Sequence, residues 1–439
     1  MARIEHGFIT AVTVKRIGAN SYIYLLNRRY FLFSIGWVVV RTELKRLCII
    51  VHKNYYFDTR IRRYAESLLK CGFQVDVICP PQEYEKSFEV IKGLKVYTIP
   101  IHHRQRGPIG YVLEYGLSFF LYCIYLMFLH IKNQYQFIHV HNLPDLLVFS
   151  ALIPRIFGTP LILDIHDPMP ELFISKYGEG AHKLIYRLIV LQEKLSCMLA
   201  NAVITANSIF KQNIIARGTP AEKITVINNY PDLKIFNRSS YINARKARKE
   251  AFTLIYPGTI APRYGLETAI RALPLLVTRI PNISLVIIGP EAPHKEQLKQ
   301  LVEKLGLSSH TVFLPLAKNE EMPQRIAQAD IGIYPALCDA HMNIATPTKV
   351  LEYAAMGIPI ISSRLRIMEE IFGNSSIMMF EPEDVNQFAQ CVIKLYENPS
   401  LREELVLKAD QKFVQKCCWE NEVQKYLALL NQLIQGKYE

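Results

Sequence analysis

The sequence alternates, twice over, between short apolar segments and longer segments with helical periodicity. The first series occupies residues 46–230 and the second residues 251–410, and turn residues follow most of the apolar segments. Strands that are apolar along their whole length are typical of parallel sheets that helices cover on both faces. The pattern therefore predicts an α/β fold with two doubly wound, Rossmann-like domains that face a central cleft, where the carboxyl ends of the strands hold a ligand.

Three other segments complete the organisation. Residues 231–250 are polar and basic and have no apolar periodicity, which predicts an interdomain linker. Residues 1–45 precede the regular alternation and are expected to form an N-terminal extension outside it. A last helix is expected within residues 411–439. The chain has 439 residues, a length that suits two domains of roughly 200 residues each.

The charge balance narrows the class of partner. Lys and Arg number 51 and Asp and Glu 39, which gives a formal net charge of +12. An excess of basic residues favours phosphorylated substrates or an anionic membrane face. Nucleic acid is the weakest candidate, because the sequence has no RRM, zinc-finger or helix-turn-helix signature. The nine cysteines form no CxxC pair, so we expect reduced thiols and no zinc site.

Two apolar segments raise the question of a membrane. Residues 30–40 are too few to span a bilayer. Residues 115–131 contain no Asp, Glu, Lys or Arg, but a membrane span there would divide a continuous α/β domain. We therefore expect a core helix or a helix lying on the surface. Arg104 and Arg106 precede this aromatic-rich segment and favour attachment to an anionic membrane surface.

Two strand exits of the second series carry groups suited to a nucleotide. YPGTIAPRYGLE, at residues 256–267, is typical of a strand, a glycine turn and a helix start. Gly258 allows close approach of the backbone to a phosphate, and Arg263 with the helix N-terminus adds positive potential. Such a turn is also common without a ligand. IIGPEAPHK, at residues 287–295, is suited to holding a base or a ribose.

A third exit, at residues 346–363, is TPTKVLEYAAMGIPIISS. Thr346 is expected to cap a helix that begins at Pro347, and its N-terminus with Lys349 suits a diphosphate. Glu352, one turn further on, can accept two sugar hydroxyls. The alternative is a surface ion pair between Lys349 and Glu352. Asp339, His341 and Asn343 lie in the preceding loop.

In the first series, DIHDPMPE at residues 164–171 places acids and a histidine at a strand end. His166 is a candidate general base, metal ligand or hydrogen-bond donor to a substrate hydroxyl. The metal alternative fits poorly, because no second His or Cys stands at ligand spacing nearby. His139 and His141 alternate along a strand and point the same way, as core histidines also do. The absence of a DxD motif argues against a Mg²⁺-bound diphosphate.

These motifs together resemble a known family. The second series is similar to the C-terminal domain of the family 4 retaining glycosyltransferases, which have the GT-B fold, in YPGTIAPRYGLETAIRAL, LVIIGP, ADIGIYP and PTKVLEYAAMGIPII. The first series resembles the N-terminal domain of bacterial members in FDTRIRRYAESLLKCGFQVDVI, FIHVHNLPDLL, LILDIHDPMPELF and ITVINNYPD. The resemblance covers residues 46–410. In this fold the C-terminal helix often crosses back to the first domain, as we expect of residues 411–439.

The resemblance implies sugar transfer from a UDP- or GDP-linked donor, with retention at the anomeric carbon and without a metal or other cofactor. The positions that match the donor-binding residues are Gly258, Thr259, Arg263, Thr348, Lys349 and Glu352. Those expected to act in catalysis are His166, Arg263 and Lys349. Asp58 and Arg60 are expected on the acceptor side.

The sequence departs from the family at three positions. Thr259 and Tyr264 stand where the family often has Arg and Lys, so Arg263 and Lys349 are left to supply the positive charge. Glu352 matches the second Glu of the family's Glu-x7-Glu motif, but the first falls at Ile344. Contacts to the donor sugar are then expected from Asp339, His341, Asn343 or backbone amides.

The expected mechanism is electrostatic. Arg263, Lys349 and the helix N-terminus stabilise the leaving diphosphate, and the acceptor hydroxyl attacks from the same face. The resemblance and the basic charge together favour surface polysaccharide biosynthesis (capsule, exopolysaccharide or O-antigen) on a polyprenyl-diphosphate-linked or saccharide acceptor. A cytoplasmic protein, peripheral on the inner face of the plasma membrane, is expected. The alternatives are a non-catalytic sugar-nucleotide-binding subunit of an assembly complex and a GT-B nucleotide-sugar 2-epimerase.

Overall fold

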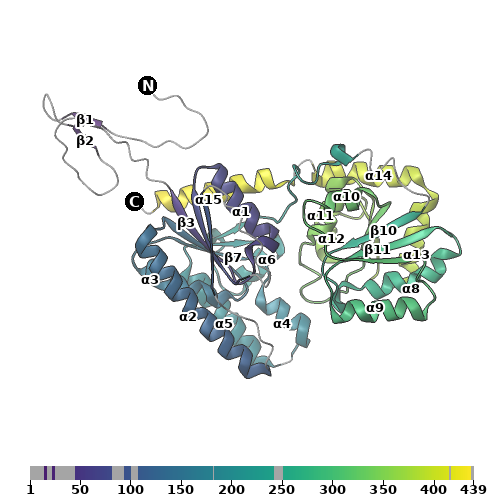
Figure 1. Ribbon diagram of the computed structural model, residues 1–439, viewed down its shortest axis with the longest axis horizontal. Coiled ribbons are helices and arrows are strands. Elements are labelled where there is room, and N and C mark those ends of the chain that lie inside the picture. The colour runs from purple at the N-terminus through teal and green to yellow at the C-terminus, as the bar shows by residue number, and fades with distance from the viewer. Residues whose placement is uncertain are drawn as a thin grey trace. The chain divides into compact units, whose positions relative to one another are not determined.

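A computed structural model describes residues 45–81, 93–99, 107–180, 182–241, 251–414 and 417–436, together with two short strands near the N-terminus. The chain divides into two units, Met1–Leu44 and Lys45–Glu439. In the first unit β1 (Val14–Arg16) pairs antiparallel with β2 (Tyr22–Tyr24). The rest of this unit, with the apolar segment 30–40, lies outside the described residues. Figure 1 shows the larger unit, which holds both α/β domains.

The first domain is built on a parallel sheet in the order β5-β4-β3-β6-β7-β8-β9. Its strands are β3 (Arg46–Ile50), β4 (Gln74–Cys79), β5 (Leu94–Thr98), β6 (Phe137–His141), β7 (Leu161–Ile165), β8 (Ala202–Thr205) and β9 (Ile224–Val226). Leu47 and Ile49 pack into one core cluster and Cys48 and Ile50 into another. Helices therefore cover both faces of the sheet, as the wholly apolar strands predict.

The helical elements of this domain lie between the strands. They are η1 (Tyr55–Phe57), α1 (Thr59–Lys70), α2 (Gly107–Asn133), η2 (Asp145–Ala151), α3 (Leu152–Ile156), α4 (Met169–Tyr177), α5 (Lys183–Leu199), α6 (Ser208–Ala216) and η3 (Ala221–Lys223). The stretch after β6 forms mostly the 3-10 helix η2, followed by the short helix α3. Pro144 precedes η2 and Pro154 lies within α3, and proline cannot donate the backbone hydrogen bonds of a continuous helix.

The second domain has a parallel sheet in the order β12-β11-β10-β13-β14-β15. The strands are β10 (Phe252–Pro257), β11 (Ile283–Ile288), β12 (Thr311–Leu314), β13 (Ile331–Tyr334), β14 (Ile360–Ser363) and β15 (Met378–Phe380). The helical elements are η4 (Arg238–Tyr241), η5 (Pro262–Tyr264), α8 (Leu266–Val277), α9 (Pro293–Lys304), α10 (Met322–Ala327), α11 (Thr348–Met356), α12 (Arg366–Phe372), α13 (Val385–Glu397) and α14 (Pro399–Ala409), followed by the π-helical turn η6 (Asp410–Val414). The fold class predicted from the sequence is confirmed.

The first half of the predicted linker belongs to the second domain. Phe236 is buried in that domain's core, and Leu233 and Ile235 pack against it. Arg238 donates to Asp410 at 2.8 Å and to the carbonyls of Ala354 and Ala355 at the end of α11. These scattered apolar residues have no helical or strand period, which is why the sequence pattern did not reveal their packing. Residues 242–250 lie outside the described part of the chain.

The last helix, α15 (Trp419–Gln435), packs on the first domain, as expected of the C-terminal segment. The Trp419 indole donates to Ser67 Oγ at 2.9 Å, and Tyr426 OH lies 2.9 Å from His139 Nδ1. Figure 1 shows α15 above the sheet that contains β3 and β7. The two ends of the larger unit are thus joined by buried contacts.

The long apolar helix α2 is a surface-lying helix of the first domain. By length and composition its residues 116–133 could cross a membrane, but Tyr122, Leu126 and Leu129 are buried against the sheet. The Tyr122 hydroxyl also donates to Val51 O at 2.8 Å. The opposite side of the helix is exposed, with Phe120 65% and Phe128 68% accessible. Arg104 and Arg106 lie outside the described residues.

The cysteines, all of which lie in the described part of the chain, are free. Cys48, Cys79, Cys197 and Cys391 are buried, whereas Cys71 and Cys338 are exposed. Burial of the thiols is therefore not general.

Candidate active site

Lys349, on the first turn of α11, lies in a cage of tyrosines at the strand exits of the second domain. Its Nζ donates to Tyr256 OH at 2.6 Å and lies 3.8 Å from the ring centroid of Tyr256 and 4.5 Å from that of Tyr264. Tyr334 adds a third ring at 5.6 Å. No ion pair joins Lys349 to Glu352, although both residues are described. Of the two alternatives left by the sequence, the surface ion pair is excluded.

Gly258 follows β10 and faces the Lys349 ammonium group. Its φ is +121°, and a Cβ at this position would lie 3.0 Å from Lys349 Nζ. The Gly258 amide donates to Ile288 O at 2.8 Å, while Thr259 is exposed and its carbonyl accepts from Tyr256 OH at 2.8 Å. The predicted glycine turn and the predicted lysine, 91 positions apart in the sequence, are therefore in contact.

The N-terminus of α11 differs from the prediction. Thr346 is not the N-cap: the helix begins at Thr348, with half-buried Thr348 as its first residue and Pro347 in the capping position. Within the described chain no side chain caps this end. Thr346 Oγ1 instead accepts from Asn207 Nδ2 at 3.2 Å, since Asn207 reaches it from the first domain. The uncapped end of α11 leaves a positive dipole beside Lys349.

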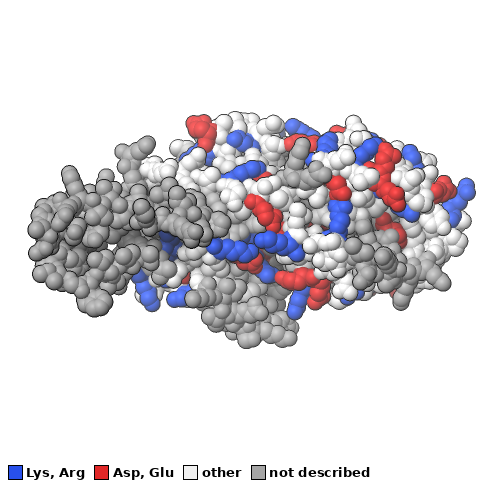
Figure 2. Space-filling model, turned by 90° about the horizontal axis from the view of Figure 1, so that it is seen from above, with Lys and Arg blue, Asp and Glu red and all other residues white. Residues whose placement is uncertain are grey.

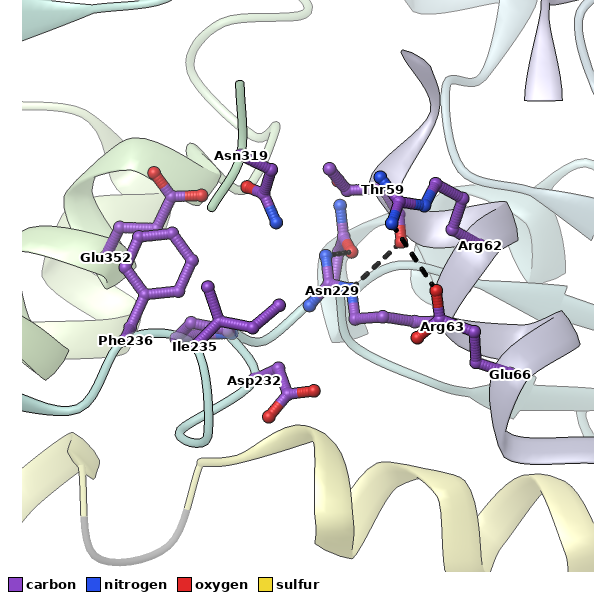
Figure 3. Close-up of a pocket in the computed structure, with 11 residues that line it drawn as sticks. Thr59, Arg62, Arg63, Glu66, Asn229, Asp232, Ile235, Phe236, Asn319 and Glu352 are labelled. Carbon is purple, nitrogen blue, oxygen red and sulfur yellow. Dashed lines mark hydrogen bonds and ion pairs between the residues drawn. The ribbon is translucent and has the colours of Figure 1, made fainter. Parts of the chain in front are cut away.

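Glu352 lies one turn further along α11 and is half-buried in a cavity (Figure 3). The cavity is also lined by Thr59, Arg62, Arg63, Glu66, Asn229, Pro231, Asp232, Ile235, Phe236 and Asn319. Burial raises the pKa of Glu352 to about 7, against the opposing charges of Arg63 and Lys349. Burial likewise lowers the pKa of Lys349 to about 7. Both groups therefore titrate near neutral pH.

Arg263 forms part of a chain of polar contacts that ends in the other domain. Its Nη2 donates to His341 Nδ1 at 2.7 Å, so the proton of a neutral His341 ring lies on Nε2. That Nε2 is 3.4 Å from Asp167 Oδ1. Burial alone would raise the pKa of Asp167, but the hydrogen bond from His341 and the charge of His166 lower it well below its usual value.

His166 follows β7, as predicted. Its backbone N–H donates to Asn142 Oδ1 at 3.2 Å, and neither of its buried ring nitrogens has a hydrogen-bond partner among the described residues. A buried imidazole without a partner is costly unless a ligand or water supplies one. The ring of His166 is thus available to a bound group.

The loop before α11 is mostly occupied with its own structure. Asp339 accepts from the N–H groups of His341 and Met342 at 2.8 and 2.7 Å, and Asn343 accepts from Arg366 N at 2.8 Å. Ile344 is 6% exposed and packs in the second core. Of the side chains suggested for the donor sugar, His341 is the one placed between the domains.

Asn207 is a site residue that the sequence analysis missed. Its Oδ1 caps α6 by accepting from Phe210 N at 2.8 Å, and its Nδ2 donates to Ile344 O at 2.9 Å as well as to Thr346. Its place before an amphipathic helix signals a cap, but nothing local signals a contact with residues 137 and 139 positions away.

Asp58 and Arg60 contribute to the fold rather than to an open acceptor surface. Asp58 caps α1 by accepting from the N–H groups of Arg60 and Ile61. Arg60 is 3% exposed and donates to both carboxylate oxygens of Asp164, at 2.9 and 3.0 Å, and to Ile227 O. The buried carboxylate of Asp164 requires a cation, and Arg60 supplies it. The prediction that Arg60 faces the acceptor is wrong for this reason.

His139, His141 and Asp164 bring three possible metal ligands within 4.8 Å of one another. They do not fit a cation. Arg60 already holds both oxygens of Asp164, and its guanidinium would repel a metal ion. Burial, the largest cause, and neighbouring positive charges lower the pKa of both imidazoles well below the usual value, so they are neutral. This cluster joins β6 and β7 to α15.

Two family models match the chain in succession. Residues 58–230 match the glycosyl transferase 4-like domain, and residues 237–412 match the glycosyl transferases group 1. Together they cover the second sheet, the first sheet apart from β3, and the candidate site. The chain is a family 4 glycosyltransferase.

Two known relatives of this glycosyltransferase are identical to it at about a quarter of the aligned positions. The sulfoquinovosyl transferase SQD2 of Arabidopsis thaliana is 23% identical over 376 residues, which cover 83% of this chain and 68% of the relative. The amylovoran biosynthesis glycosyltransferase AmsK of Erwinia amylovora is 24% identical over 233 residues, 53% of this chain and 54% of AmsK.

Solved structures place the glycosyltransferase in the GT-B fold. Sucrose-phosphate synthase from Thermosynechococcus elongatus superposes with a TM-score of 0.72 and 17% identity, covering 89% of this chain and all of that one. Anabaena Alr3699/HepE, solved in complex with UDP and glucose, superposes with a TM-score of 0.64 and 16% identity, covering 88% and 99%. At these identities the likeness concerns the fold.

The cationic group of the glycosyltransferase comes from a different element than in the family pattern. Tyr264 stands where a turn lysine is common, and the Lys349 ammonium, delivered from α11, lies over its ring. Lys349 of α11 therefore supplies the turn with the positive charge that the family pattern places within the turn itself. With Gly258 and the open end of α11, this arrangement can hold an anion of the size of a diphosphate.

Proposed function

We propose that this glycosyltransferase transfers a sugar from a UDP- or GDP-linked donor, with the donor diphosphate between the Gly258 turn and the N-terminus of α11. The contact between Lys349 Nζ and Gly258 carries the proposal, because it brings a cation to a position where only glycine leaves room for a phosphate. The UDP and glucose bound to Alr3699/HepE support a nucleotide-sugar donor. Glu352, on the same helix, is proposed to accept the ribose hydroxyls.

The proposed chemistry is retaining and needs no metal. As the glycosidic bond breaks, negative charge grows on the diphosphate, and Lys349 and Arg263 stabilise it. The acceptor hydroxyl attacks from the face that the diphosphate leaves, and its proton passes to a diphosphate oxygen. His166 offers an unpartnered ring nitrogen to a hydroxyl of the donor sugar. The stereochemistry is tested by NMR of the anomeric proton in donor and product, with EDTA present.

The proposed setting is surface polysaccharide biosynthesis at the cytoplasmic face of the plasma membrane, with a polyprenyl-diphosphate-linked or saccharide acceptor. The name of the relative AmsK, which refers to amylovoran biosynthesis, supports a polysaccharide product. The net charge of +12 and the exposed apolar side of α2 support an anionic membrane surface nearby.

One observation favours a second candidate function. Ile344 stands at the first Glu of the Glu-x7-Glu motif and is buried, so that carboxylate has no substitute at the same place. A non-catalytic subunit that binds a sugar nucleotide would tolerate this loss. An epimerase would also bind the donor, but it would release the nucleotide without needing an acceptor.

The deciding experiment measures binding and turnover separately. UDP, GDP and their sugar conjugates are compared by thermal shift, since a bound donor raises the melting temperature with occupancy. Nucleotide release is then followed with and without extracted lipid-linked saccharides. Lys349→Met should abolish both signals, while Lys304→Met, at the exposed end of α9, should change neither.

Three results would contradict the proposal. Donor binding without any acceptor-dependent release favours the non-catalytic subunit. Nucleotide release that ignores the acceptor favours the epimerase. Polysaccharide made at the normal rate by cells that carry Lys349→Met, Arg263→Ala and Glu352→Ala excludes catalysis at this site.

A further inference from the structure

Most of the large apolar side chains that are exposed in the described chain belong to the first domain. Of the twenty-two large apolar residues that are exposed in the described chain, sixteen lie on α2, on η2 and α3 with the residue that follows, and on α5. We call this surface the apolar face. Contiguous apolar surface of this extent marks an interaction site on a folded protein.

The helix α2 presents one complete apolar stripe to the outside. Leu117, Phe120, Ile124 and Phe128 follow one another at spacings of three and four residues and are each at least 60% exposed. Its other side is already used, because Tyr122 packs in the first domain. The helix is therefore apolar all round while only one side is covered by protein.

The helix α5 has its polarity reversed. Leu184, Leu188, Leu191 and Leu195 point outward and are 44% to 71% exposed. Glu193, on the inner side, is 1% exposed and pairs with Arg217 at 2.6 Å. A helix on a surface in contact with water normally buries its leucines and exposes its glutamates. The orientation of α5 is instead suited to a non-aqueous surrounding.

The three elements form one continuous face. η2 packs against both α2 and α5, and Ser196 Oγ on α5 donates to Asp145 O of η2 at 3.3 Å. Arg155 of α3 donates to Leu199 O at the end of α5 at 3.3 Å. Figure 1 draws α2 and α5 on the same side of the domain, and α3 contacts both α2 and η2. The two stripes are thus neighbours on one surface.

The exposed charged side chains carried by the elements of the apolar face have a single sign. Within residues 116–133, 145–157 and 183–199 the exposed charged side chains are Lys132, Lys183, Arg187 and Lys194, whereas Asp145 and Glu193 are buried. On the face shown in Figure 2, by contrast, basic and acidic side chains are interspersed. A basic border around an apolar centre complements an anionic lipid surface. A second copy of this face would bring like charges together.

We infer that the apolar face inserts into the headgroup region of an anionic bilayer, with α2 and α5 lying in the plane of the membrane. The inference deepens the proposed membrane setting and rests on it, but it does not depend on the sugar-transfer chemistry. A span is not required, because α2 remains packed on its sheet through Tyr122. The apolar stripes supply the insertion and the basic side chains the preference for anionic lipid.

The test is flotation of the full chain with vesicles of phosphatidylcholine, with or without phosphatidylglycerol. Wild type should float with the anionic vesicles. Leu188→Glu with Met198→Glu, on α5, should lower partitioning by roughly tenfold or more, because two charges enter the apolar layer. Leu316→Glu with Leu407→Glu, at similarly exposed positions of the second domain, should not change it.

A charge variant tests the lipid preference. Replacing Lys183, Arg187 and Lys194 together by Gln should reduce binding to anionic vesicles by about fivefold for each charge removed. Binding to neutral vesicles should stay the same. Equal binding of this variant and wild type to anionic vesicles would overturn the electrostatic part of the inference.

Two other results would overturn the insertion itself. One is flotation of the α5 double variant at the wild-type level. The other is a wild-type protein that does not float but forms a dimer, while the double variant is monomeric. In that case a second copy of the chain, and not lipid, would cover the apolar face. Leu191→Trp gives a readout that does not rely on a charged variant folding: its fluorescence should be quenched by lipids brominated on their chains, and no quenching contradicts insertion.

Failure of this inference is distinguishable from failure of the proposed function. The α5 double variant should keep the thermal shift with the donor nucleotide, because its changes lie outside the donor site. If the double variant no longer floats but keeps its thermal shift with nucleotide, the result supports insertion of the apolar face without testing the donor site. Normal flotation without any nucleotide-induced thermal shift supports insertion of the apolar face and contradicts the proposed donor site.

Discussion

At the scale of single residues, Lys349 and Glu352 determine how the candidate site responds to pH. Both are half-buried, and burial brings the pKa of each to about 7 from opposite directions. The ammonium is held by three aromatic rings and one tyrosine hydroxyl rather than by a carboxylate. Such a site is poorly stabilised when empty and gains most from an anionic ligand.

Binding of UDP or GDP should take up a proton at Lys349. The free site has a lowered pKa, and a bound diphosphate raises it, so above about pH 7 affinity should fall by up to about tenfold per pH unit. Calorimetry at pH 8 in two buffers of different ionisation enthalpy measures the uptake. Lys349→Met should bind weakly and show no uptake. A binding enthalpy of wild type that is the same in both buffers would contradict the assignment.

Stability of the ligand-free protein should follow the same two groups. Glu352 has a raised pKa in the folded state, so between about pH 4.5 and 7 the folded protein binds more protons than the unfolded chain and loses stability as pH rises. Glu352→Gln should therefore raise the melting temperature at pH 8 and change it little at pH 4.5. An equal shift at both pH values would show that the carboxyl does not titrate in this window.

Gly258 should tolerate no side chain. Gly258→Ala places a Cβ 3.0 Å from Lys349 Nζ on a backbone with φ +121°, which costs about 1–3 kcal/mol and fills the proposed phosphate site. Donor binding, followed by thermal shift, should be lost. Gly306→Ala is the matched control, since its φ is +68° and no atom lies within 4 Å of the added Cβ. It should lose stability but keep the donor; loss of the donor in both variants would contradict the assignment.

At the scale of elements, α15 is fastened to the first domain by a buried polar network. The Tyr426 hydroxyl forms a hydrogen bond with His139 Nδ1, and the ring of His139 packs against the ring of His141. Both histidines lie beside the Arg60–Asp164 ion pair. Because these groups are buried, each depends on its partner being present. The helix that closes the chain is therefore part of the first core rather than an appendage.

Removing one hydroxyl from this network should be measurable. Tyr426→Phe leaves the buried His139 Nδ1 without a partner, and we expect a loss of about 1–3 kcal/mol in the free energy of unfolding of the first domain. Urea unfolding monitored by Trp419 fluorescence would show it. Tyr177→Phe, at a residue 49% exposed, should cost almost nothing. Equal losses in the two variants would mean that the network does not stabilise α15.

At the scale of the whole larger unit, the described contacts between the domains gather near the candidate site. Asn207 reaches Ile344 and Thr346, and His341 joins Asp167 to Arg263. Phe210, at the start of α6, packs with the second core. The candidate site residues of the two domains are thus held together by hydrogen bonds rather than by an extensive shared core.

Asn207→Asp should lower the turnover of the enzyme without destabilising its fold. The carboxylate can still cap α6 but cannot donate to Ile344 O or Thr346 Oγ1, so kcat/KM should fall by about five- to thirtyfold while the melting temperature changes little. Asn237→Asp, at an exposed residue whose Oδ1 accepts from Ser239 as an Asp oxygen also can, is the control. Unchanged turnover in Asn207→Asp would show that this contact does not position the site.

Much of the fold was predictable because its signals are local. Wholly apolar strands followed by turn residues located the sheet strands from β3 to β14, and the order of the alternation made them parallel. The sequence pattern did not predict β15, because this strand has three residues and no apolar alternation of its own. The packing of residues 233–236 escaped because isolated apolar residues carry no period.

The sequence by itself determined the two-domain α/β architecture and the positions of Gly258, Lys349 and Glu352 at strand exits. Tertiary structure alone decided their partners. Helical spacing allowed Lys349 to pair with Glu352, but two strands and the 3-10 helix η5 bring tyrosines to its ammonium group. Arg60 was drawn inward by Asp164, 104 residues away. Periodicity depends on neighbours in the chain, whereas the direction of a charged side chain depends on which distant groups folding places within its reach.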